Sequence, residues 1–136
     1  MVDVVVIGSG IMGAAAAREL SKYNLNIIVL EKEHDVSNGT TKANSAIIHA
    51  GYDAQNGTLM AKYNALGNAM FDDLCKEIDA PFRRCGSFVL AFSEEEKEHL
   101  KVLYDRGIKN GIPGIEILEG VEVLKREPNI NKEVVA

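Results

Sequence analysis

The chain has 136 residues, of which 46% are hydrophobic and 26% are charged, and its formal net charge at pH 7 is −5. These proportions are those of an ordinary globular protein, and the acidic balance excludes a basic surface for nucleic acid. The apolar run at the N-terminus is too short to span a membrane and lacks the basic flank of a signal peptide. We therefore expect a cytoplasmic protein with no nucleic-acid partner and no membrane span. The scattered histidines and two cysteines predict no metal site.

A glycine-rich turn near the N-terminus lies between two apolar runs. The segments, in chain order, are a strand from Val2 to Ile7, the turn Gly8-Ser9-Gly10-Ile11-Met12-Gly13, a small-residue helix from Ala14 to Leu20, and a strand from Ile27 to Leu30 that ends on Glu31. Strand, glycine turn, helix and a strand ending on an acid form the arrangement that holds the ADP half of a dinucleotide. The sequence therefore predicts an α/β fold that begins with the βαβ unit of a Rossmann-like domain.

Each residue type in this motif has a physical role. Gly8 permits the tight turn, Gly10 lets the backbone approach a pyrophosphate, and Gly13 lets the helix pack close to the strands. The N-terminus of the helix directs N–H groups at the phosphates. Glu31 lies 18 residues after Gly13, near the usual separation of about 20, and its carboxylate can accept the ribose hydroxyls. It would repel a 2′-phosphate, which argues against an NADP-type ligand.

The rest of the chain predicts further elements. Thr58 is the expected N-cap of a helix that runs to about Glu77, with an apolar stripe that we expect to form core. The other expected elements are a strand over 88–92, a helix opened by the capping box of Ser93 and Glu96 and stopped near Gly111, a short strand over 115–118, a helix over 121–126 and a final strand beginning near residue 133. Only one βαβ unit is visible, so we expect this chain to be part of a larger protein.

Small and hydroxylated residues crowd ahead of a single histidine between Thr40 and Gly51. Hydroxyls and free backbone N–H groups suit a pyrophosphate or a ring system that must be approached closely. On chemistry alone, a single histidine on an apolar segment such as His49 is more often a structural residue than a functional one.

The βαβ unit, Thr40-Thr41 and the run from Asn44 to Gly51 together resemble the FAD-dependent oxidoreductases of the D-amino-acid-oxidase-like superfamily. Within that superfamily the chain is most similar to the glycerol-3-phosphate oxidase and dehydrogenase group. The similarity continues through 57–64, 89–92, 106–108 and Glu127-Pro128, and it covers about the first third of such a protein. It implies an FAD-binding part over 1–80 and the beginning of an α+β substrate domain over 81–136.

The resemblance also implies residue roles. Gly8, Gly10, Met12 and Gly13 would contact the FAD pyrophosphate. The remaining implied contacts are the adenosine ribose for Glu31, the adenine for Lys32, the pyrophosphate and ribityl chain for Thr40 and Thr41, and the flavin ring for Ser45, Ala46 and Ile47. His49 would face the substrate, with Ser45 nearby. The family usually has glycine where this chain has Ala46, which places that contact in question.

The implied reaction is oxidation of glycerol 3-phosphate, a phosphorylated polyol, to dihydroxyacetone phosphate. A neutral imidazole at His49 would take the hydroxyl proton while hydride passes to the flavin. The candidates for phosphate binding by charge alone are Lys42, Arg83 and Arg84, and the resemblance implies that the phosphate ligands lie beyond residue 136. The electron acceptor, oxygen or a partner protein, stays open. Two alternatives also stay open: a 2-hydroxyacid oxidase of the L-2-hydroxyglutarate type, and a non-catalytic dinucleotide-binding module.

Overall fold

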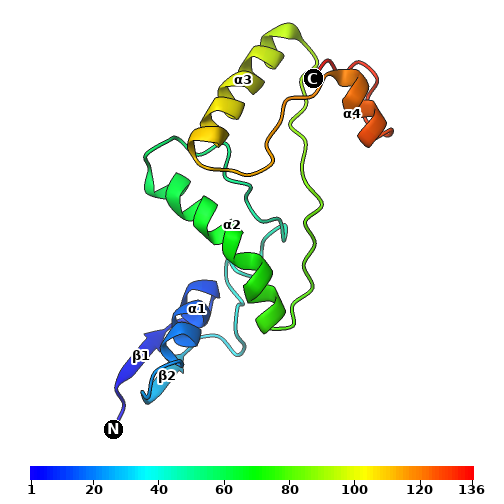
Figure 1. Ribbon diagram of the computed structural model, residues 1–136. Coiled ribbons are helices and arrows are strands. Elements are labelled where there is room, and N and C mark those ends of the chain that lie inside the picture. Colours follow the sequence, from blue (N-terminus) through cyan, green and yellow to red (C-terminus); the bar gives the residue numbers. More distant parts are fainter. The chain divides into compact units, whose positions relative to one another are not determined.

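The computed structural model describes residues 1–136 and contains two strands and four helices (Figure 1). They are β1 (Val4–Ile7), α1 (Ile11–Leu20), β2 (Ile27–Leu30), α2 (Leu59–Glu77), α3 (Glu94–Lys109) and α4 (Gly120–Arg126). The chain forms two compact units, residues 1–47 and residues 48–136. The expected domain division at residue 80 concerns the whole protein and stays a prediction.

The first unit is the expected βαβ unit. β1 and β2 pair in parallel, with Val4 opposite Ile27 and Ile7 opposite Leu30. The ladder continues into the glycine turn, where the amide of Gly8 donates to the carbonyl of Leu30 over 2.7 Å. Parallel neighbours need a crossover between them, and α1 provides it. The helix begins at Ile11 rather than at Ala14, so the glycine motif itself forms its first turn.

The second unit contains the three remaining helices. α2 begins at the predicted N-cap, where the hydroxyl of Thr58 accepts the amide of Ala61 over 3.2 Å. The expectation that its apolar stripe forms core is wrong. Most of the stripe is exposed, with Tyr63 59% and Met70 61% exposed, and Leu74 is only partly buried. The buried residue of the helix is instead the small Ala61.

α3 begins and ends as the sequence predicts. The hydroxyl of Ser93 accepts the amide of Glu96 over 3.2 Å, and the carboxylate of Glu96 accepts the amide of Phe92 over 2.7 Å. Gly111 follows the helix with a φ of +75°, the left-handed conformation that ends many helices. α3 has acidic residues in its first turn and basic residues in its last turn. Charges in these places interact favourably with the helix dipole.

The strands expected over 88–92, over 115–118 and from residue 133 do not form. Residues 80–92 run extended between α2 and α3 (Figure 1), but Ala91 alone pairs, with Val135 and Ala136. A single paired residue cannot make a ladder. In the C-terminal segment, the carbonyl oxygen of Val135 accepts the amide of Gly120 at the start of α4. A Cβ on Gly120 would lie 2.1 Å from the carbonyl oxygen of Val134, so this approach requires glycine.

Buried side chains in the second unit are small, as Ala54, Ala61, Ala91 and Val123 illustrate. No helix is long and apolar enough to cross a membrane.

Candidate functional site

The glycine turn between β1 and α1 has the close contacts that its spacing predicts. Gly8 has a φ of +95°, which a residue with a side chain rarely adopts. A Cβ on Gly13 would lie 1.9 Å from the carbonyl oxygen of Gly8 and 3.3 Å from Cγ1 of Val6. The first turn of α1 therefore lies directly against the end of β1, and its N-terminus is brought to the edge of the sheet.

The N-terminus of α1 is capped from a distance. Its N-cap residue is Gly10, which has no side chain to accept a hydrogen bond. The hydroxyl of Thr41 accepts the amide of Ile11 over 2.9 Å instead. That hydroxyl keeps its own proton, which can be donated to an anion. One side chain thus stabilises the helix start and adds a donor where an anion is favoured.

Glu31 is fixed by the glycine turn. Its Oε2 accepts both the amide of Ser9 over 2.8 Å and the hydroxyl of Ser9 over 2.7 Å. Its Oε1 accepts the amides of Lys32 over 2.8 Å and Glu33 over 3.1 Å. Ser9 is buried, at 6% exposed. The acid at the end of β2 is therefore held in one orientation at the side of the turn.

The same hydrogen bonds lower the pKa of the Glu31 carboxyl. The donors, led by the side chain and backbone of Ser9, bring the pKa from 4.5 to about 2. A carboxylate that accepts several N–H and O–H groups is stabilised in its charged form. Glu31 therefore stays ionised. Its roughly four lone-pair sites already accept these four donors, so a ribose hydroxyl would share or replace one of them.

A hollow of about 310 Å³ lies beside these groups in the first unit. Five of the predicted cofactor residues line it, together with four neighbouring residues. The lining residues are Gly10, Glu31, Lys32, Glu33, Ser37, Asn38, Gly39, Thr40 and Thr41. The carboxylate of Glu31, the hydroxyls of Thr40 and Thr41 and the N-terminus of α1 around one hollow fit the ribose and pyrophosphate of an ADP group. Gly8 and Gly13 form the turn but do not line the hollow. Met12 is exposed and does not line it either.

The segment predicted to run beside the flavin ring contains a strained residue. Ala46 has a φ of +55°, and its amide is accepted by the side chain of Asn44 over 2.7 Å. Only glycine adopts this left-handed region without steric cost. The departure from the family glycine therefore has a backbone consequence in addition to the added methyl group. Ser45 and Ile47 are exposed on either side, and neither lines the hollow.

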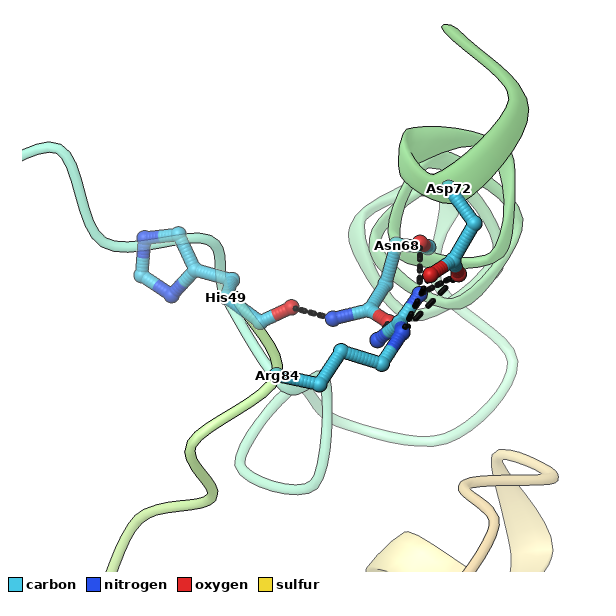
Figure 2. Close-up of polar contacts among 4 residues, drawn as sticks. All are labelled: His49, Asn68, Asp72 and Arg84. Atoms are coloured by element: carbon cyan, nitrogen blue, oxygen red, sulfur yellow. Dashed lines mark hydrogen bonds and ion pairs between the residues drawn. The ribbon is translucent and has the colours of Figure 1, made fainter. Parts of the chain in front are cut away.

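His49 belongs to the second unit, and its backbone is held there. Its carbonyl oxygen accepts Nδ2 of Asn68 in α2 over 2.9 Å. Figure 2 shows the imidazole ring on the opposite side of the backbone, pointing away from Asn68, Asp72 and Arg84. The ring is exposed, so it is accessible to a substrate.

Arg84 completes this arrangement. Its Nη1 donates to Oδ1 of Asn68 over 2.8 Å, its Nη2 donates to the carbonyl oxygen of Asn68 over 2.9 Å, and its Nε donates to Asp72 over 2.9 Å. The Arg84 guanidinium lowers the pKa of the Asp72 carboxyl, and the carboxylate raises the pKa of Arg84. Most donors of Arg84 are therefore engaged within the unit, which weakens its candidacy as a phosphate ligand.

The loop that follows His49 is anchored to the end of α3. Nδ2 of Asn110 donates to the carbonyl oxygens of Gly51 over 3.1 Å and Ala54 over 2.8 Å. Arg106 donates to the carbonyl oxygen of Asp53 over 2.6 Å. A Cβ on the buried Gly107 would lie 2.5 Å from Cδ1 of Ile115 and 3.1 Å from Cβ of Tyr52. Arg106 thus holds the loop by a hydrogen bond, and Gly107 allows the loop to pack closely against α3.

Several residues that matter here were missed by sequence reasoning. Ser9 lies between Gly8 and Gly10 of the glycine motif, and a hydroxylated residue there, with an acid at the end of the second strand, was a signal that could have been used. Asn68, Asp72 and Asn110 left no such signal, because their partners are 12 to 59 residues away in the chain. No group of three or more His, Cys, Asp or Glu side chains is placed to hold a metal ion.

A family model described as DAO, FAD dependent oxidoreductase, matches residues 3–136. The chain belongs to this family of FAD-dependent oxidoreductases. In the DAO family, a glycerol 3-phosphate dehydrogenase from Caloramator mitchellensis is 58% identical over 98% of this chain and 28% of its own length. An L-2-hydroxyglutarate dehydrogenase from Dictyostelium discoideum is 41% identical over 95% of this chain and 30% of its own length.

A solved structure is also similar along almost the whole chain. It is the dithionite-reduced L-α-glycerophosphate oxidase of Mycoplasma pneumoniae with FAD bound, with a TM-score of 0.81 and 37% identity. The alignment covers 98% of this chain and 35% of that one. The α/β fold class and the family resemblance are confirmed. This chain spans about a third of the length of the DAO-family proteins that it matches.

Proposed function

We propose that the protein containing this chain is an FAD-dependent enzyme that oxidises glycerol 3-phosphate to dihydroxyacetone phosphate. The observation that supports this substrate most strongly is the 58% identity to a glycerol 3-phosphate dehydrogenase over 98% of the chain. The identity to the L-2-hydroxyglutarate dehydrogenase is lower, at 41%.

The first unit would hold the ADP half of FAD. Glu31 would accept the ribose hydroxyls, with Lys32 beside the adenine. The amides at the start of α1 and the hydroxyls of Thr40 and Thr41 would hold the pyrophosphate, where the dipole of α1 favours negative charge. What supports these roles is that Gly10, Glu31, Thr40 and Thr41 line one hollow. Ser45, Ala46 and Ile47 would lie beside the flavin.

His49 would be the base of the reaction. A neutral imidazole accepts the proton of the substrate hydroxyl as the carbinol carbon loses hydride, which leaves a ketone. When bound, FAD supplies the redox chemistry by accepting that hydride. What supports the assignment is an exposed ring on a backbone held by Asn68. Ser45 would add a substrate contact.

Two other functions give different experimental results. An L-2-hydroxyglutarate dehydrogenase would share the cofactor and the base but require a dicarboxylate substrate. A non-catalytic module would bind the dinucleotide without reducing it. Oxygen or a partner protein would serve as electron acceptor.

The test uses the whole protein, purified with its FAD and mixed without oxygen with each substrate in turn. We expect glycerol 3-phosphate to bleach the visible flavin absorbance rapidly and L-2-hydroxyglutarate to leave it almost unchanged. The reverse order would favour the 2-hydroxyacid enzyme. A protein with bound FAD that neither substrate reduces would contradict the proposed activity.

A further inference from the structure

The side chain of Asn68 connects α2 to the backbone of His49. Its Nδ2 donates to the carbonyl oxygen of His49 over 2.9 Å. Asn68 is partly buried on α2, a regular helix of 19 residues. The backbone from which the imidazole extends is therefore held by a hydrogen bond from a helix and not only by the loop that contains it.

Arg84 determines which way the Asn68 amide faces. A guanidinium can only donate hydrogen bonds, so the group of Asn68 that faces Nη1 at 2.8 Å must be its oxygen. The amide nitrogen is then directed toward the carbonyl of His49. Without Arg84, the His49 carbonyl alone would orient the amide, which would then be free to rotate toward other partners. Arg84 thus selects the orientation that binds His49.

Asp72 holds Arg84 in place. It lies one helical turn after Asn68, so both side chains extend from the same side of α2. Both oxygens of its carboxylate accept Nε of Arg84, over 3.1 and 2.9 Å. The pair is about half exposed, at 46% for Arg84 and 58% for Asp72. Exposed ion pairs stabilise a fold little, so orientation of Asn68 is the better explanation of this arrangement.

We propose that Asn68, oriented by Arg84 and Asp72, is a positioning residue that fixes the imidazole of His49 for proton transfer. The proposal rests on the proposed role of His49 as the base. Small displacements of a catalytic group reduce rates strongly, by about 10²-fold for about 1 Å. Asn68→Ala should therefore slow flavin reduction by glycerol 3-phosphate by about 10–100-fold, by analogy with partners that orient the ligands of metal sites.

A double-mutant cycle in the whole, FAD-loaded protein separates positioning from general damage. If Asn68 acts through the imidazole, Asn68→Ala should cause no further loss once His49→Asn has removed that ring. Equal losses in both backgrounds would overturn the proposal, as would a wild-type rate for Asn68→Ala beside a slow His49→Asn. A wild-type rate for His49→Asn would instead reject the base assignment, and the positioning role with it.

Hydrogen–deuterium exchange of the same proteins gives a readout independent of turnover. We expect faster exchange in the peptide over 46–52 for Asn68→Ala and for Arg84→Lys, since lysine lacks the fork that bridges Asn68 and Asp72. Alanine is a good helix former, so α2 should persist. Asp72→Asn should have the same effect. Asp73→Asn, at the exposed neighbouring position without an ion pair, should have none. Unchanged exchange over 46–52 in the Asn68 and Arg84 variants would overturn the proposal.

Discussion

The hydroxyl of Thr41 accepts the amide of Ile11 across 30 residues of sequence, over 2.9 Å. This contact joins the segment after β2 to the first turn of α1. It also places the hydroxyl next to Gly10, where an added Cβ would lie 3.1 Å from it. The N-terminus of α1 is therefore organised before any anion binds there.

Thr41→Val should remove this distant cap while keeping the shape of the side chain. Loss of an N-cap acceptor costs about 1 kcal/mol, and the lost hydroxyl should also weaken FAD binding. Thr41→Ser keeps the acceptor and should behave nearly as wild type. Thermal unfolding and FAD titration of the apoprotein measure both effects. Equal behaviour of the Val and Ser variants would show that the hydroxyl has no role.

Glu31→Gln should destabilise the protein in a pH-dependent manner. Because the pKa of Glu31 is lowered from 4.5 to about 2, its stabilising effect is fully present above pH 4.5 and is lost as pH falls toward 2. The Tm difference between wild type and Glu31→Gln should therefore be greatest near neutral pH and decrease in acid. A Tm difference that stays constant over this range would contradict the assigned hydrogen bonds.

Gly13→Ala should abolish tight FAD binding. The added methyl would meet the carbonyl oxygen of Gly8 at 1.9 Å, so α1 must move away from β1. Gly67→Ala is the matched control, because Gly67 lies inside α2 with no neighbouring atom near an added Cβ. Alanine there should stabilise the helix by up to about 1 kcal/mol. FAD content after purification and Tm distinguish the two variants, and normal FAD content in Gly13→Ala would refute the close packing.

Ala46→Gly should relieve the left-handed backbone at φ +55°. The steric cost for a residue with a Cβ is about 1–2 kcal/mol, and glycine loses about 0.5–1 kcal/mol of it through its greater freedom in the unfolded chain. We expect a net stabilisation of up to about 1.5 kcal/mol in urea unfolding. A destabilised Ala46→Gly would mean that the segment adopts a different conformation in the whole protein.

Local patterns predicted the local structure well. The glycine spacing predicted the βαβ unit, and Thr58 and Ser93 predicted the starts of α2 and α3, because caps act over three residues. The prediction of a strand over 88–92 was wrong because strand pairing depends on a distant partner, and only Ala91 pairs with one. The exposed stripe of α2 and the Asn68–His49 contact were beyond prediction for the same reason, since each depends on which distant segments meet.

The assignment of His49 as the base is tested by comparing wild type with His49→Asn in the whole, FAD-loaded protein. Both are mixed rapidly with glycerol 3-phosphate without oxygen, and flavin absorbance is followed. If His49 is the base, FAD content should be equal in the two proteins and the reduction rate about 10²–10⁴-fold lower in His49→Asn, the usual contribution of a general base. Reduction of both proteins at the same rate would contradict this assignment.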